Sequence, residues 1–350
     1  MLKHKESFQT VDKSLKRTVS LFLFLLFILL IMCLISLGTG HLSMTPSEVW
    51  FTLIGEGTDR NALLLFQFRL PRIFIAILVG VGMGVSGAIF QGVTQNGLAD
   101  PGIIGIHSGS GFFVVLYLYI ISLQNTQLTG DSQFSQISLP FAAFVGGLTA
   151  AILIYALAWK KGVNPIRLIL VGIGVNAGFS AALLVIQLRM AESDFNRAIV
   201  WLSGSIWNST WSTVWSLLPW ILLFLPLAMF KARVLTIMQL GDDMATGLGT
   251  SIEKERIYLI VIGVALASAS VAAAGGISFL GLLAPHLARR LVGGKYQRLI
   301  PITACIGAGL LLFSDTVART LLAPTEIPVG LLVSVLGAPY FIYLLMTIDD

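Results

Sequence analysis

Residues 231–256 read KARVLTIMQLGDDMATGLGTSIEKER and form one of the longest polar interruptions in a very apolar chain. Apolar runs lie on both sides, at residues 213–230 and 257–273, and each approaches the roughly 20 residues with which a helix crosses a bilayer. The centre, QLGDDMATGLG at residues 239–249, predicts a short helix bounded by glycines, which allow sharp turns at both ends. We therefore expect a membrane protein with a loop that binds a partner outside the membrane.

The composition indicates that most of the chain lies in lipid. Of 350 residues, 56% are hydrophobic and 11% are charged, whereas a soluble domain carries about 25% charged residues. We expect a cytoplasmic tail over residues 1–18 and a single transmembrane domain over residues 19–350, because no polar segment is long enough to bury a core of its own. Cys33 and Cys305 lie within apolar runs and are interpreted as unpaired. The net charge of +5 does not indicate nucleic-acid binding.

The apolar runs predict about ten transmembrane helices. They lie at residues 21–37, 73–93, 103–123, 139–159, 166–188, 213–230, 257–273, 277–291, 299–322 and 329–346. The eighth is short and contains Pro285, which breaks or kinks a helix. Lysine and arginine are concentrated in the N-terminal tail and in the segments after the fourth, sixth and eighth runs. Because cytoplasmic loops are rich in these residues, we expect both termini and residues 231–256 in the cytoplasm.

The connection between the first two spans, residues 41–61, is expected on the outer side. Thr45-Pro46-Ser47-Glu48 has the form of a capping box with proline at the first helical position. This pattern predicts a short amphipathic helix at the membrane surface.

The sequence does not support an energy source within the chain. Gly293-Gly294-Lys295-Tyr296 lacks the Ser or Thr and the upstream spacing of a Walker A loop, and no cluster with metal-ligand spacing occurs. Ion-coupled carriers place charged residues at mid-membrane. Here the main candidate is Asp315, which precedes Arg319 by one helical turn and favours a local ion pair. We therefore expect no enzyme activity, metal or cofactor, and energy supplied by a partner.

Six blocks of sequence, in order, resemble one known family. They are residues 69–72 (RLPR), 86–105 (SGAIFQGVTQNGLADPGIIG), 240–249 (LGDDMATGLG), 276–290 (GISFLGLLAPHLARR), 315–319 (DTVAR), and 326–330 (EIPVG) with 337–339 (GAP). In this order and spacing they resemble the FecCD/BtuC-like permeases of ABC importers for iron-siderophores, haem and cobalamin. The resemblance covers nearly the whole chain from about residue 38 onward. One departure is Gly97, which stands where the family usually has proline and gives the local backbone more freedom.

The resemblance implies an all-α polytopic membrane protein with the fold of a type II, BtuC-like ABC importer permease. It implies a multi-pass protein of the cytoplasmic membrane that pairs with a second permease subunit, identical or paralogous. Two cytoplasmic ABC ATPases and an extracellular substrate-binding protein are the other implied partners. The implied cargo is a ferric siderophore, with haem or cobalamin as the alternatives. An ion-coupled secondary transporter and a membrane receptor or scaffold are the rival functions from other classes.

The resemblance also implies three groups of site residues. ATPase coupling is expected of Leu240, Gly241, Asp242, Met244, Ala245, Leu248 and Gly249, with Arg289 and Arg290 as neighbours at the inner mouth. In this group Met244, Ala245, Leu248 and Gly249 would offer a small apolar face to a groove on the ATPase. Docking of the binding protein is expected of exposed arginines, namely Arg69, Arg72 and Arg319, and contact with lipid phosphates is the alternative. The pathway candidates are Gln91, Asn96, Asp100 and Pro101, in a turn that could line the pathway or fold back for packing.

Overall fold

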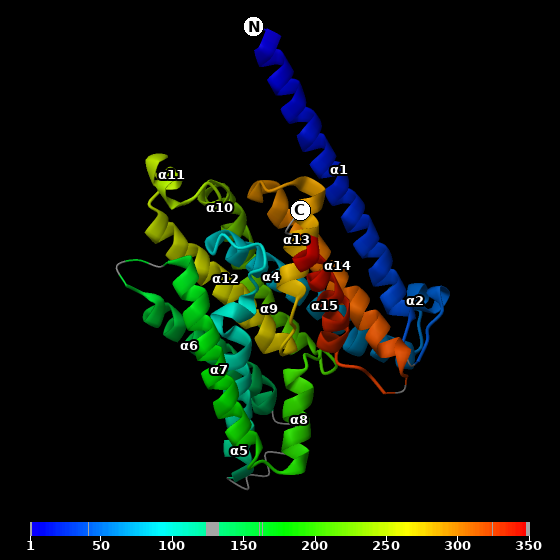
Figure 1. Ribbon diagram of the computed structural model, residues 1–350. Coiled ribbons are helices and arrows are strands. Elements are labelled where there is room, and N and C mark those ends of the chain that lie inside the picture. Colours follow the sequence, from blue (N-terminus) through cyan, green and yellow to red (C-terminus); the bar gives the residue numbers. More distant parts are fainter. Residues whose placement is uncertain are drawn as a thin grey trace.

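A computed structural model describes residues 2–40, 42–123, 133–160, 162, 164–323 and 325–347. Within these ranges helices are joined by turns and short irregular connections, which confirms the expected all-α fold (Figure 1). The first elements are α1 (Leu2–Gly38), α2 (Pro46–Leu53), α3 (Asp59–Leu63), the π-helical η1 (Leu64–Arg69), α4 (Leu70–Val93), the 3-10 helix η2 (Pro101–Ile104), α5 (Ile106–Leu123), α6 (Gln133–Ala158) and α7 (Pro165–Gln187). The remaining elements are α8 (Glu192–Leu202), α9 (Trp211–Phe230), α10 (Ala232–Met238), α11 (Asp242–Gly247), α12 (Ile252–Ala274), α13 (Leu280–Val292), α14 (Tyr296–Leu321) and α15 (Val329–Thr347).

Nine helices in the described part of the chain are long and apolar enough to cross a membrane. They correspond to nine of the expected spans, and the expected eighth span is α13. With 13 residues, α13 is about 20 Å long at about 1.5 Å per residue, whereas the apolar layer of a bilayer is about 30 Å thick. The chain before α13 is irregular, and Gly275 and Gly276 lie against the backbone carbonyls of Trp201 and Leu202. Protein therefore covers this irregular segment, as non-helical backbone at membrane depth requires.

The centre of the bundle is built from α4, α12 and α14, which are mostly buried along their apolar windows. A Cβ atom on Gly80 would overlap the carbonyl oxygen of Gly307 on α14, and one on Gly87 would overlap that of Gly281 on α13. The backbones of α4 and its two neighbours are thus in direct contact. Helix association in lipid depends on such close packing, because no hydrophobic force drives apolar helices together there.

Two long helices lie at the periphery. In the most apolar 18-residue stretch of α1 no residue is buried in this chain, and in the corresponding stretch of α7 only 6% of the residues are buried. α1 runs along one side of the bundle, and α7 lies with α5 and α6 on the other side (Figure 1). α7 exposes large apolar side chains, including Leu170, Ile173 and Leu184.

The bundle has two distinct ends, which we call the α11 end and the α2 end. α1 begins and α15 ends toward the α11 end, where α10 and α11 also lie, and α2 lies at the opposite end (Figure 1). At the α2 end, the backbone N–H of Thr45 donates to Glu48 Oε2 at 2.7 Å, and the N–H of Glu48 donates to Thr45 Oγ1 at 3.3 Å. The expected capping box is confirmed. Its hydrogen bonds from the Thr45 backbone and hydroxyl lower the pKa of Glu48.

Candidate functional site

The α11 end carries the polar segment between α9 and α12, in which α11 is the expected short helix and α10 was not predicted. Gly241 and Gly249 lie on either side of α11 with φ angles of 93° and 80°, in the left-handed region that glycine tolerates. The ammonium group of Lys231 donates to both carboxylate oxygens of Glu255 at 2.8 and 2.7 Å. This ion pair ties the start of α10 to the first turns of α12.

Three apolar side chains protrude from this segment. Leu240, Met244 and Leu248 are 56%, 65% and 64% exposed. Met244 and Leu248 are four residues apart, a spacing that aligns side chains along one face of a helix, and Leu240 precedes the turn at Gly241. Ala245 is fully buried in the hydrophobic core, so the expectation that it belongs to the exposed apolar face is wrong. The exposed face consists of Leu240, Met244 and Leu248, and we call it the coupling face.

Asp242, the first residue of α11, faces the body of the protein with its carboxylate. Nη2 of Arg256 donates to Asp242 Oδ1 and Oδ2 at 2.8 and 2.9 Å, and the Arg256 side chain is only 3% exposed. Nε2 of Gln95 donates to the same Oδ1 at 3.1 Å and to the carbonyl of Met238 at 3.0 Å. A charge-assisted bond to a buried arginine is stronger than one between neutral groups. Asp242 thus joins α11 to α12 and to the turn after α4.

Arg289, in the last turn of α13, is the predicted neighbour of the residues expected to bind the ATPase. Its Nη2 donates to Gln91 Oε1 and to the hydroxyl oxygen of Tyr296, both at 3.4 Å, and its guanidinium lies 5.6 Å from the Tyr296 ring centre. With the Gln239 amide oriented so that its oxygen faces Arg289, Nη1 also donates to Gln239 at 2.8 Å. Gln239 precedes the coupling face directly, so Arg289 lies beside that face. Gln91 lies near the end of α4 and is buried.

Arg290 is exposed and contacts a different element. Its guanidinium lies 5.5 Å from the ring centre of Tyr343 on α15. One turn earlier, the ring of His286 meets that of Tyr340 edge to face, with the centres 5.6 Å apart. These contacts join the end of α13 to α15.

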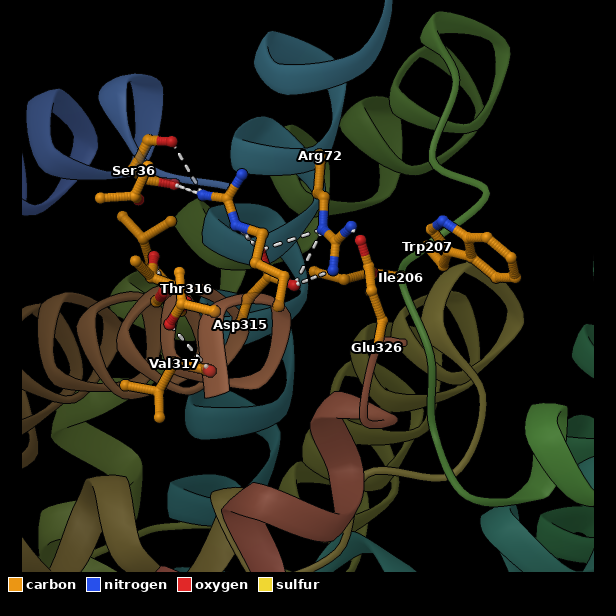
Figure 2. Close-up of polar contacts among 12 residues, drawn as sticks. Ser36, Arg72, Ile206, Trp207, Asp315, Thr316, Val317 and Glu326 are labelled. Carbon is orange, nitrogen blue, oxygen red and sulfur yellow. Dashed lines mark hydrogen bonds and ion pairs between the residues drawn. The ribbon is translucent and has the colours of Figure 1, made fainter. Parts of the chain in front are cut away.

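A buried cluster of charged side chains lies at the α2 end (Figure 2). Arg72, in the first turn of α4, donates from Nη2 to Asp315 Oδ1 at 2.8 Å and from Nε to both Asp315 oxygens at 2.9 and 3.1 Å. Its Nη1 donates to Glu326 Oε2 at 2.8 Å. The Asp315 side chain is 0% exposed and that of Glu326 is 26% exposed. One arginine thus connects α4 with α14 and with the segment before α15.

The other two predicted docking arginines join the same cluster. Nε of Arg319 lies 3.7 Å from Asp315 Oδ2, which agrees with the expected pair one turn apart, and its Nη2 donates to the carbonyl and hydroxyl oxygens of Ser36 (Figure 2). Arg69 donates to the carbonyls of Leu37 and Leu42. The expectation that these three arginines are exposed is wrong, because carboxylates and carbonyls supplied by α1, α14 and the following loops enclose their guanidinium groups.

The turn between α4 and α5 holds the other pathway candidates. Asn96 Oδ1 accepts from the N–H of Leu98 at 2.9 Å, and Asp100 Oδ1 accepts from the N–H of Gly102 at 2.8 Å. Pro101 lies against Gly281 of α13, where a Cβ atom would collide with the proline ring. These contacts agree with the packing alternative for the turn.

Sequence reasoning missed the residues that connect these elements. Gln95 and Arg256 hold Asp242, and Asn176 on α7 donates from Nδ2 to the carbonyl of Gly102 at 3.0 Å. Asn176 Oδ1 also accepts from the Ser108 hydroxyl at 2.6 Å. An asparagine in an apolar span was a detectable signal, because polar residues within membrane helices usually bond to a neighbouring helix.

In the part of the chain that the structure describes, no group of three or more His, Cys, Asp or Glu side chains is arranged to hold a metal ion. The cysteines Cys33 and Cys305 are unpaired, as expected.

Comparisons with known proteins connect this arrangement to a family. The FecCD transport family matches residues 28–347. The iron(3+)-hydroxamate import system permease protein FhuG of Bacillus subtilis (strain 168) is 56% identical over 319 residues, which cover 91% of this chain and 94% of that protein. The iron-uptake system permease protein FeuC of the same organism is 40% identical, over 91% of this chain and 94% of its own length. The hemin transport system permease protein HmuU of Yersinia pestis is 37% identical, over 92% and 94%.

A solved structure described as an inward-facing conformation of a putative metal-chelate type ABC transporter also matches. It superposes with a TM-score of 0.80 at 30% identity and covers 95% of this chain and all of that chain. The helices and their order are therefore those of a known type of transport permease.

Proposed function

This chain belongs to the FecCD transport family, and from that premise we propose that it carries an iron(III)-siderophore across the cytoplasmic membrane as the permease subunit of an ABC importer. The observation that carries the choice of cargo is the 56% identity to an iron(3+)-hydroxamate permease, against 37% to a hemin permease. A ferric hydroxamate is therefore the first cargo to test. Haem and cobalamin are the alternatives.

The chemistry of the spans suits a large wrapped chelate. Helices α5, α9 and α15 contain no Asp, Glu, Lys or Arg. A siderophore supplies all the ligands of its iron, and the binding protein selects it first, so the pathway needs few polar groups. Of these helices, α9 and α15 also contain no His and so offer little to a carrier that moves by binding and releasing a proton or sodium ion, because such carriers use ionisable residues within the membrane.

We propose that the partner that supplies the energy for transport binds at the α11 end. The coupling face is apolar and exposed, and it lies on and just before a short helix that Asp242 and Ala245 fix to the body of the protein. Such a face fits a groove on another protein in the manner of helix-in-groove recognition. The occupant of this role would be the cytoplasmic ATPase, which puts the α11 end and both termini in the cytoplasm.

A second permease subunit, a copy or a paralogue, would complete the pathway. α7 is the natural contact, because it is hardly buried in this chain and carries Gly174 and Gly178, where an added Cβ would meet nothing within 4 Å. Small residues on an open helix face permit the close approach on which membrane helix pairs depend. Two ATPases would then bind one to each permease.

Docking of the substrate-binding protein is assigned to the α2 end. The cluster there contains three arginines and two acids, so it is short of negative charge. Glu326 is its accessible acid. A carboxylate on the binding protein would compete with Glu326 for Arg72, because arginine pairs strongly with carboxylates.

Reconstitution of the complete importer in proteoliposomes tests this function. With binding protein outside and ATP inside, a radiolabelled ferric hydroxamate should accumulate, and haem or cobalamin should not compete for uptake. Import without ATP that a protonophore abolishes would identify an ion-coupled carrier instead. Competition by haem would identify haem as the cargo, and absence of any flux would support a receptor or scaffold.

A further inference from the structure

Movement of the coupling face needs a route to the membrane helices, and the contacts of Asp242 indicate where it begins. Asp242 lies on the short helix that carries the coupling face, and its carboxylate accepts from Arg256 and Gln95. Arg256 lies in the second turn of α12, one of the three central helices. Gln95 follows Thr94, the residue that caps α4, and belongs to the turn that leads to η2. Of these two partners, Gln95 lies on the irregular segment between α4 and η2, and Arg256 lies on a central helix.

The backbone of Gln95 is unusual. Its φ angle is 52°, and only one other non-glycine residue, Phe279, has positive φ in the part of the chain that the structure describes. The N–H of Asn96 donates to the carbonyl of Gln91 at 3.1 Å, and that of Gln95 donates to Gly92 at 3.3 Å. This is the Schellman pattern that ends a helix, and its left-handed position usually holds glycine. A glutamine there is less favourable for the backbone but provides an amide that reaches α11.

The turn that follows is braced and ends on α7. Asn96 and Asp100 each accept a hydrogen bond from a backbone N–H two residues later, which makes the segment compact. At its far end, the carbonyl of Gly102 accepts from Nδ2 of Asn176 at 3.0 Å. Asn176 lies near the middle of the 23-residue α7, a helix that is only 6% buried in its apolar window. A shift of the turn would therefore be delivered to a peripheral helix at mid-span.

We propose that Gln95 and Asn176 are positioning residues of one linkage, in which the coupling face moves Gln95, the turn of residues 96–101 moves with it, and Asn176 transmits the shift to α7. The proposal rests on the proposed function, because it assumes that a partner moves the coupling face. It assigns no contact with cargo or nucleotide to either residue.

The test compares import with ATP hydrolysis in the reconstituted importer. Gln95→Gly removes the amide and relaxes the left-handed backbone, so the turn itself is retained. Gln95→Asn keeps an amide and a residue type that tolerates this conformation, but it is one methylene too short to reach Asp242. Asn176→Leu keeps the approximate size of the side chain and removes its hydrogen bonds. Gln297→Asn is the matched control, because it shortens an amide that accepts from Thr236 of α10 at the same end of the molecule.

We expect each of the three variants to keep binding-protein-stimulated ATP hydrolysis within about twofold of wild type and to import at least about fivefold less radiolabelled ferric hydroxamate per ATP. Fivefold corresponds to about 1 kcal/mol at about 1.4 kcal/mol per factor of ten. The double variant Gln95→Gly/Asn176→Leu should import no less ferric hydroxamate per ATP than the more impaired of the two single variants, because both changes interrupt the same linkage. Gln297→Asn should import like wild type.

Three outcomes would overturn the linkage. The single variants could keep the wild-type ratio of import to hydrolysis, or their losses could multiply in the double variant, which would make them independent. A parallel loss of hydrolysis and import would make Gln95 or Asn176 a requirement for assembly instead. Failure of the wild-type importer to take up the ferric hydroxamate is a different result, because it counts against the proposed function and leaves the ratio undefined for all variants.

Discussion

Replacement of Asp315 with asparagine tests whether charge holds the cluster at the α2 end together. The Asp315 side chain is 0% exposed, accepts three hydrogen bonds from Arg72 and lies 3.7 Å from Nε of Arg319. Asparagine preserves the shape and one acceptor oxygen, but it removes the negative charge between two buried guanidinium groups. Removal of one partner from a buried ion pair destabilises a protein by about 3–5 kcal/mol, because the remaining charge stays buried.

We expect the melting temperature of the purified permease in detergent to fall by about 4–7 °C. This is about 3–5 kcal/mol divided by an unfolding entropy of about 0.7 kcal/mol/K, from about 2.1 cal/mol/K for each of 350 residues. Glu326→Gln is the matched control, since it removes a carboxylate from the same Arg72. Because Glu326 is 26% exposed, that loss should stay below about 1 kcal/mol, or about 1 °C.

A double variant separates charge from shape. Arg72→Gln/Asp315→Asn removes both charges and should melt above Asp315→Asn alone, because only one of the two buried guanidinium groups that shared Asp315, that of Arg319, then remains. The reasoning would be refuted if Asp315→Asn melts within about 1 °C of wild type, or if the melting temperature of Glu326→Gln falls as far as that of Asp315→Asn. Either result would show that burial of the carboxylate does not decide its contribution.

Three other expectations concern the two ends and the core. Met244→Asp should lower co-purification of the ATPase at least about tenfold without a change in melting temperature, because Met244 is exposed, whereas Ala245→Asp should destabilise the permease itself, because Ala245 is buried. Glu326→Gln should raise the affinity for the binding protein about threefold in a surface-binding assay, because Arg72 loses its accessible acid; an unchanged affinity would argue against docking at Arg72. Gly87→Leu should prevent folding, as judged by gel filtration of the expressed protein, whereas Gly97→Ala should not, because only the first would meet an opposing backbone.

Most of the fold was predictable because it depends on local pattern. Apolar runs of sufficient length predict spans whatever their neighbours are, and nine of the ten runs are confirmed as long apolar helices. The run around α13 is different. Its boundary depends on the irregular segment before it, which is covered by Trp201 and Leu202 from distant parts of the chain. No local sequence pattern indicates that these distant residues cover the segment.

The site was less predictable because it depends on contacts across the sequence. Arginine at an outer membrane surface predicts exposure, but Arg72 meets its carboxylates 243 and 254 residues later. The error at Ala245 is of another kind. Met244 and Leu248 are four residues apart in a predicted helix, and this spacing would have separated them from Ala245 before the structure was known. Gln95 gave no signal, because its role follows from a left-handed backbone.

The distribution of polar contacts also indicates how coupling can work. Among the described residues, the cluster around Asp315 and the contacts of Asp242 lie at opposite ends of the bundle, and the helices α5, α9 and α15 contain no Asp, Glu, Lys or Arg. In the centre, α4 touches α13 and α14 backbone to backbone at glycines, and packed backbones resist deformation because they contain no side chains that can adjust. If the centre moves as a block, opening of a pathway falls to helices outside it. α7 is such a helix, and Asn176 connects it with the turn that Gln95 joins to the coupling face.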